Sequence, residues 1–304
     1  MMTIFFRWLV FLWLAAVPWR GVLAEVSALD VVASFSIVGD MVQRVGGERV
    51  RVHLLVGPDA DAHVYQPTPA DARKVAQARL VVVNGLNYEG WITRLVRAAG
   101  YRGDVVRAAE GVQVLRSGGD THGHGHGHEE ADPHAWQDLK NARRYVENIR
   151  GALVRIDPAG KAVYDANASG YLTEMDQLDA EIRTMIGRLP ADRRTVITSH
   201  DSFAYFSRAY GIRFVAPVGV STEAAASAAD VGKLIRQVRK EKIPAIFMEN
   251  VSDPRLLERI RAETGAKVGG TLYSDALSKS AGAASSYLAM MRHNAATLAT
   301  ALAP

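Results

Sequence analysis

Histidines are the residues of this chain whose type and spacing could do chemistry, because neutral imidazole is the commonest metal ligand in proteins. Five of the nine histidines fall in THGHGHGHEEADPHAW, residues 121–136. Four of them alternate with glycine, and the fifth, His134, stands in the different context DPHAW. Two kinds of metal site are therefore open: a loose one in the glycine–histidine run and a tight one built around another histidine. The run comprises His122, His124, His126 and His128.

The glycine–histidine run is a poor candidate for the tight site. Glycine loses much conformational entropy when it is ordered, so we predict a flexible His-rich loop over residues 117–131. Its functional interpretation is an accessory, low-affinity zinc collector beside His134, or a docking patch for a periplasmic metal chaperone. The alternative is an inserted tract that binds metal only because any histidine tract does.

The elements on either side of this loop predict an α/β fold. Short apolar strands alternate with amphipathic helical segments in both halves of the chain, which favours two mostly parallel β-sheets flanked by helices. A helical stretch from about residue 159 to 188 has no convincing break, and at about 30 residues it would reach roughly 45 Å. We predict a signal peptide at 1–24, an N-terminal α/β lobe at 25–157, a linking backbone helix at 158–189 and a C-terminal α/β lobe at 190–304. The strands are expected at Leu29–Phe35, Val50–Val56, Leu80–Val83, Asp104–Val106, Thr195–Thr198, Ala245–Met248 and Lys267–Leu272.

Four metal-capable side chains follow predicted strands or precede a predicted helix. His63 and His134 come from the first half, and His200 and Asp275 from the second. Ligands of open α/β sheets bind outside the carboxyl ends of the strands, so two facing sheets would bring these groups together. Three imidazoles and one carboxylate form a closed four-ligand set suited to tetrahedral Zn²⁺.

A secreted zinc hydrolase is the alternative from a different class. A catalytic zinc keeps three protein ligands and an open position for water. This chain offers four candidate ligands and no HExxH motif, and only Glu249 and Asp201 are candidate bases. We therefore predict a metal-binding protein and not an enzyme, while a metal buffer or adhesin stays open as a further role.

The start of the chain and its composition bear on location. Arg7, the apolar run of residues 8–17 and the small residues before Glu25 predict a cleavable secretory signal peptide. The apolar run is well short of the roughly 20 residues that span a bilayer. The chain has no cysteine that could carry a lipid at the cleavage point, so we predict a free periplasmic protein that is not lipidated. We also expect it to be a monomer. The formal net charge of +4 is too small to indicate a nucleic-acid partner.

Six segments, taken together, resemble the metal-binding solute-binding proteins of ABC importers, the zinc/manganese group that includes ZnuA-like and TroA-like proteins. They follow one another along most of the chain: DAHVYQPTPAD, NGLNYEGW, DPHAWQD, SHDSFAYFSRAYGI, AIFMEN and YSDAL. The resemblance implies two α/β lobes joined by a long backbone helix and a metal between the lobes. It also implies an inner-membrane ABC permease and its ATPase as partners. The implied ligands are His63, His134, His200 and Asp275.

The chain departs from that family at two informative positions. Some zinc members carry an acid just before the first histidine, and Ala62 cannot play that part, which favours Asp275 as the fourth ligand. Manganese-selective members tend to have Glu where this chain has His200. Imidazole in place of carboxylate shifts preference from Mn²⁺ toward Zn²⁺. We therefore expect Zn²⁺ ahead of Mn²⁺, although some members with the same ligands also handle manganese.

Overall fold

The first lobe is built on a parallel sheet of four strands in the order β2-β1-β3-β4. A computed structural model describes residues 28–117 and 130–304. The central strands β1 and β3 are almost entirely buried, because their apolar runs meet helices on both faces of the sheet. The elements of this lobe are β1 (Leu29–Phe35), α1 (Ser36–Gly46), β2 (Val50–Val56), α2 (Pro69–Gln77), β3 (Leu80–Val83), α3 (Ile92–Ala98), β4 (Asp104–Arg107) and α4 (Leu139–Ile156).

The second lobe repeats this plan with a parallel sheet in the order β10-β9-β7-β8. A small separate core fills the space between one face of this sheet and helices α7 and α8. Strand β8, which has only three residues, was not among the predicted strands. The elements are β7 (Thr195–Ile197), α6 (Ala204–Tyr210), β8 (Arg213–Val215), α7 (Ala228–Glu241), β9 (Ala245–Glu249), α8 (Arg255–Thr264), β10 (Lys267–Leu272) and α9 (Tyr287–Leu302).

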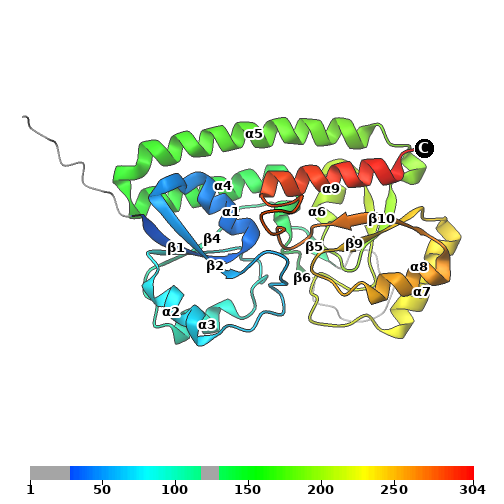
Figure 1. Ribbon diagram of the computed structural model, residues 1–304, viewed down its shortest axis with the longest axis horizontal. Coiled ribbons are helices and arrows are strands. Elements are labelled where there is room, and N and C mark those ends of the chain that lie inside the picture. Colours follow the sequence, from blue (N-terminus) through cyan, green and yellow to red (C-terminus); the bar gives the residue numbers. More distant parts are fainter. Residues whose placement is uncertain (1–27, 118–129) are drawn as a thin grey trace, which may run out of the picture.

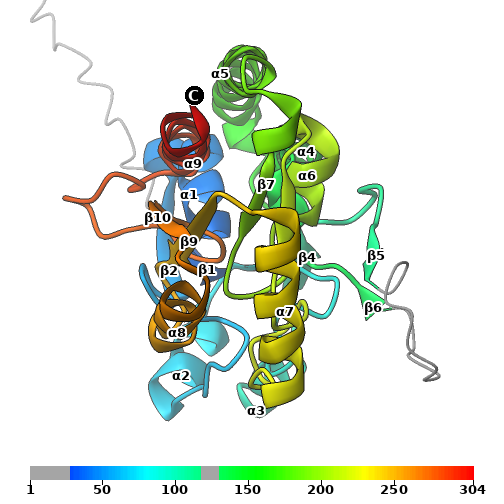
Figure 2. The ribbon, with the colours of Figure 1, turned by 90° about the vertical axis from the view of Figure 1, so that its right-hand side faces the viewer.

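One long helix, α5 (Lys161–Gly187), joins the lobes. Its 27 residues would extend about 40 Å. It packs against α1 and α4 of the first lobe and against α6 and α9 of the second, and Figure 2 shows α5 and α9 along the same edge of the molecule. The predicted linking helix is therefore confirmed. Its buried residues recur every three or four positions and form one apolar stripe: Tyr164, Ala168, Tyr171, Met175, Leu178, Ile182 and Ile186.

Short elements complete the described chain. A two-stranded antiparallel pair, β5 with β6, brackets the glycine–histidine run, whose residues 118–129 lie outside the described part, as does the predicted signal peptide. No helix within residues 28–117 and 130–304 is both long and apolar enough to span a bilayer. The short elements are η1 (Gly47–Arg49), β5 (Arg116–Ser117), β6 (Glu130–Ala131), η2 (Ala135–Gln137), η3 (Pro158–Gly160) and η4 (Ala191–Arg193).

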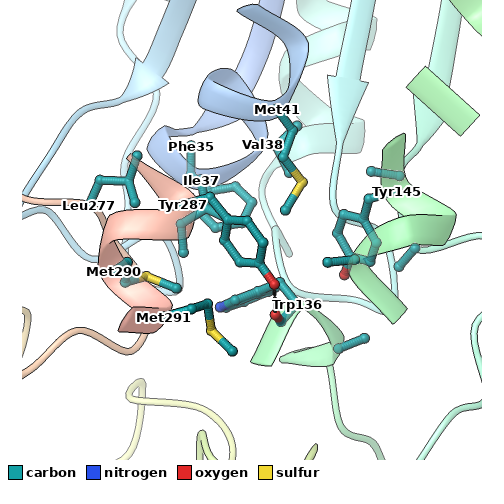
Figure 3. Packing of buried hydrophobic residues seen from close by; sticks show 14 of the residues in the cluster. Phe35, Ile37, Val38, Met41, Trp136, Tyr145, Leu277, Tyr287, Met290 and Met291 are labelled. Atoms are coloured by element: carbon teal, nitrogen blue, oxygen red, sulfur yellow. Dashed lines mark hydrogen bonds between the residues drawn. The ribbon is translucent and has the colours of Figure 1, made fainter. Parts of the chain in front are cut away.

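The main hydrophobic core runs without interruption from one lobe into the other. Figure 3 shows Tyr287 at the start of α9 pointing at Trp136 of the first lobe, where its hydroxyl donates a 2.5 Å hydrogen bond to the Trp136 carbonyl. The Trp136 indole in turn donates to the Ser274 carbonyl at 2.9 Å. The two lobes therefore share one hydrophobic core.

Candidate metal centre

Four buried side chains from both lobes converge between the two sheets. His63, His134, His200 and Asp275 each offer one ligand atom, and these atoms all lie within 4.8 Å of one another. The Nε2 atoms of His63 and His134 are 3.3 Å apart. The Asp275 carboxylate lies 3.0 Å from His200 Nε2, 3.4 Å from His134 Nε2 and 3.5 Å from His63 Nε2. The structure thus brings together the four residues that the sequence singled out.

Each of the four is placed by the end of a regular element. His63 lies in the loop after β2, and His134 immediately precedes the turn η2. His200 follows β7, and Asp275 follows β10. Because all strands within each sheet are parallel, the carboxyl ends of β2, β7 and β10 deliver these loops to the same gap.

The distances fit a divalent metal bound by all four groups. A tetrahedral site with metal–ligand distances of about 2.0–2.1 Å has ligand atoms about 3.3 Å apart, and the separations of 3.0–3.5 Å bracket that value. The fully buried Asp275 carboxylate has the three imidazole Nε2 atoms as its charged neighbours, and none of these contacts has the geometry of a hydrogen bond. A buried carboxylate is costly unless a cation balances its charge.

Two further carboxylates stand behind the imidazoles. Asp132 Oδ1 is 2.8 Å from His134 Nδ1, and it also accepts a hydrogen bond from the His134 backbone N–H at 2.9 Å. Glu249 Oε2 is 2.9 Å from His200 Nδ1. An acceptor at Nδ1 keeps the proton on that nitrogen, so that Nε2 faces the metal as a lone-pair donor.

The charges around the site favour a cation. Burial raises the pKa of Asp275, but the charges of His200 and His134 outweigh burial and hold this pKa well below its ordinary value. Burial lowers the pKa of His200, but the negative charges of Glu249 and Asp275 outweigh it and raise the pKa well above the ordinary value. Both shifts favour positive charge beside the Asp275 carboxylate, so a metal ion bound here would have to compete with a proton.

Aromatic rings wall the site on the side of the first lobe. The Tyr88 ring meets the His63 ring edge to face, with centroids 4.6 Å apart. The Trp136 ring does the same with His134 at 5.2 Å. These contacts restrict the rotation of both imidazoles.

Sequence reasoning missed the part played by Asp132 and misread that of Glu249. Asp132 stands two residues before His134 in ADPHAW, so its proximity was a usable signal. Glu249 was a candidate general base of a hydrolase. It is fully buried on the Nδ1 side of His200, away from the Nε2 atoms that converge on the site, and it accepts from the Ser199 backbone N–H at 2.6 Å. That position suits it to hold an imidazole and not to activate a water on the metal.

Two parallel α/β lobes, a long joining helix and a buried three-histidine, one-carboxylate centre define a solute-binding protein for a metal ion. The sequence model described as "Zinc-uptake complex component A periplasmic" (ZnuA) matches residues 31–301. The chain belongs to the ZnuA/TroA family of periplasmic metal-binding proteins of ABC transporters. Members of this family are solute-binding proteins and not enzymes, in agreement with the prediction from sequence.

Three relatives illustrate the range within the family. The manganese-binding lipoprotein MntA of Halalkalibacterium halodurans is 31% identical over 282 residues, which is 93% of this chain and 91% of MntA. The iron-binding protein YfeA of Yersinia pestis is 34% identical over 269 residues, covering 88% and 85% of the two chains. The structure of the periplasmic zinc-binding protein TroA from Treponema pallidum superposes with a TM-score of 0.84 at 31% identity, covering 91% of this chain and 100% of TroA. The relatives thus carry the names of three different metals.

The predicted location needs a correction. MntA and the streptococcal relatives of similar identity are named lipoproteins, which contradicts the prediction that the protein is not lipidated. The prediction rested on the lack of cysteine in the chain. The absence of cysteine bears only on a lipid attached through a cysteine side chain. It was too narrow a basis for a prediction of where the protein is located.

Proposed function

We propose that this protein captures one Zn²⁺ ion between its lobes and delivers it to an inner-membrane ABC permease that works with an ATPase. The proposed ligands are Nε2 of His63, His134 and His200 and one carboxylate oxygen of Asp275. The observation that carries the proposal is the convergence of these buried ligand atoms within 4.8 Å of one another, with the Asp275 carboxylate 3.0–3.5 Å from the three imidazoles. Family membership supports the transport role.

Zinc is proposed over manganese because of the ligand set. Three imidazoles with a single carboxylate suit the borderline Zn²⁺ ion, whereas Mn²⁺ favours more oxygen ligands. Mn²⁺ is the second candidate, since relatives such as MntA are named for manganese.

The proposed lobes run over residues 25–157 and 190–304, with 158–189 as the joint. Because the lobes share one core and α5 packs against both, we propose that metal binding closes them only slightly. Two roles of the glycine–histidine run stay predictions, because its residues lie outside the described part of the chain. They are accessory zinc binding and contact with a metal chaperone, and the residues concerned are His122, His124, His126 and His128.

The test is a titration of the metal-free protein with Zn²⁺ and Mn²⁺ in competition with a chelator of known affinity, on the wild type and on Asp275→Ala. The wild type is expected to bind one zinc ion tightly and manganese more weakly. Asp275→Ala is expected to lose more affinity than the roughly 10- to 100-fold that removal of a supporting residue costs.

Asp253→Ala serves as the matched control, because Asp253 lies on the surface and pairs with Arg255. It should leave the affinity unchanged. Full zinc affinity in Asp275→Ala would indicate a three-ligand site with an open position, as in the hydrolase alternative. Tighter binding of Mn²⁺ than of Zn²⁺ would contradict the proposal of zinc as the bound metal, but it would not contradict the four-ligand site.

A further inference from the structure

The loop that carries His63 is held to the second lobe at two points. At the first, the Asp59 backbone N–H donates to the Leu277 carbonyl at 2.9 Å, and its carboxylate accepts from the Asn250 side chain at 3.1 Å. At the second, the Thr222 hydroxyl donates to Asp61 Oδ2 at 2.6 Å. The second contact joins two loops, one from each lobe, through side chains alone.

Asp61 uses its other carboxylate oxygen to hold His63. Its Oδ1 accepts the His63 backbone N–H at 2.8 Å. One carboxylate thus fixes the backbone of a proposed ligand in the first lobe and binds a hydroxyl of the second lobe at the same time. Movement of Thr222 away from Asp61 would remove one of the two restraints on that carboxylate.

Thr222 belongs to a segment that is itself tied to His200. Val218 forms a parallel bridge with His200, and the Asp201 backbone N–H donates to the Val218 carbonyl at 3.1 Å. Backbone and side-chain hydrogen bonds therefore link His63 to His200 from one lobe to the other. Separation of the lobes at this point has to break the Asp61–Thr222 contact.

His63 is also the ligand candidate nearest to solvent. Its side chain is 5% exposed, against 0% for His134 and Asp275 and 1% for His200. It lines a cavity of about 450 Å³ whose walls come from both lobes, with Asn87 and Tyr88 on one side and Ser221 and Glu223 on the other. A metal ion that leaves by this cavity has to pass His63, and its bonds to the three deeper groups break as it moves outward.

We propose that Asp61 is a positioning residue and that its hydrogen bond with Thr222 is the latch that controls metal release. With the latch closed, Asp61 holds His63 against the metal. With the latch open, His63 is still a ligand of the bound metal but is held less firmly, so that it leaves the metal more readily toward the cavity and the ion escapes by that side. This inference rests on the proposed function, because it takes His63 as a ligand.

The test compares zinc dissociation rates of the wild type, Thr222→Val and Thr222→Ser, measured by stopped flow with an excess of a chromophoric chelator. Thr222→Val keeps the shape of the side chain and removes the hydroxyl. A hydrogen bond to a charged acceptor is worth enough to change a rate by roughly tenfold, so dissociation is expected to be about tenfold faster. Thr222→Ser keeps the hydroxyl and should restore the wild-type rate. The absorption spectrum of bound Co²⁺ should be the same in all three proteins, because the ligands are unchanged.

Thr173→Val is the matched control, since the Thr173 hydroxyl is exposed on α5 and bonds only to the Ser169 carbonyl of the same helix. It should release zinc at the wild-type rate. Equal rates for Thr222→Val and the wild type would overturn the latch while leaving the proposed function intact, and so would a fast rate in Thr222→Ser. A changed Co²⁺ spectrum in Thr222→Val would also overturn it, because Thr222 would then shape the site itself. A wild type that binds no zinc would instead refute the proposed function.

Discussion

The orientation of two imidazoles in the centre is set by the carboxylates behind them. His134 is held by Asp132 and His200 by Glu249, each at its Nδ1 atom. A carboxylate at that position fixes the ring and raises the basicity of the nitrogen that faces the metal. Glu249 stays ionised in this role: burial raises its pKa, but the charge of His200 outweighs burial and lowers it.

Removal of the charge behind His200 should weaken metal binding without removing a ligand. In Glu249→Gln the side chain keeps its size, and the zinc dissociation constant is expected to rise roughly 10- to 100-fold. Chelator competition measures the change. Glu241→Gln, which alters an exposed carboxylate paired with Arg213, is the control and should have no effect. Equal affinity in Glu249→Gln and the wild type would show that the second carboxylate is dispensable.

The four ligand candidates could be found from sequence because each one stands just beyond a strand or just before a helix. The residues that support them could not be assigned in the same way. Glu249 and His200 are separated by 49 positions, and only the pairing of β7 with β9 sets their carboxylate and imidazole side by side. Thr222 and Asp61, 161 positions apart, meet only through the packing of the two lobes.

Among the elements, helix α5 determines how the lobes are held. Gly170 interrupts its sequence at an exposed position where an added Cβ would meet nothing within 4 Å. Gly170→Ala should raise the free energy of unfolding by about 0.5–1 kcal/mol, because alanine loses less conformational entropy in a helix. Urea unfolding measures this, and zinc affinity should not change.

Gly265 provides the matched comparison for that substitution. It also has open space around it, but its φ of 72° at the end of α8 disfavours any side chain. Gly265→Ala should therefore destabilise the protein. A loss of stability in Gly170→Ala would contradict the description of α5 as an unstrained helix at that point.

The start of helix α2 makes a pH-dependent contribution to stability. Thr68 and Asp71 form a capping box there. Burial raises the pKa of Asp71, but hydrogen bonds from Thr68, Tyr65 and Lys74 outweigh it and lower this pKa to about 2. A folded-state pKa below the ordinary value adds stability at neutral pH and loses it as the pH falls toward 2.

Asp71→Asn should therefore be less stable than the wild type at pH 6, and the difference should shrink as the pH falls from 4 to 2. Urea unfolding of both proteins across this range measures the difference in unfolding free energy. A difference that stays constant with pH would mean that the Asp71 charge contributes nothing.

Most of the elements themselves could be predicted, and the misses have a physical cause. Four strands, β1, β2, β3 and β10, begin and end where the apolar pattern placed them. The strands β5, β6 and β8 have only two or three residues, which is too few for alternation to show. These strands form because their backbones hydrogen-bond to neighbouring strands. The pattern of apolar residues within one short segment does not reveal such pairing.

At the scale of the whole molecule, the two lobes should unfold together because they share one core. The Tyr287 hydroxyl bonds the buried Trp136 carbonyl across that core. Tyr287→Phe leaves this carbonyl without a partner and should cost about 1–3 kcal/mol. Circular dichroism and tryptophan fluorescence should report a single urea transition, shifted equally for both probes.

Tyr101→Phe is the control, since the Tyr101 hydroxyl makes an exposed hydrogen bond to the Asp104 carbonyl at 3.2 Å. Its effect should stay within about 0.5 kcal/mol. Two separate transitions in the wild type would contradict the shared core. The alternating strands and helices predicted both lobes, but the depth of their contact depends on side-chain packing between distant residues such as Tyr287 and Trp136.

The central claim is that one divalent metal is held by four side chains contributed equally by the two lobes. Anomalous diffraction at the zinc absorption edge, from crystals grown with one equivalent of Zn²⁺, tests it most directly. The expected result is a single strong peak about 2.0–2.2 Å from Nε2 of His63, His134 and His200 and from an Asp275 oxygen. A peak bound by only three of these groups and a water, or a peak located elsewhere on the chain, would contradict the claim.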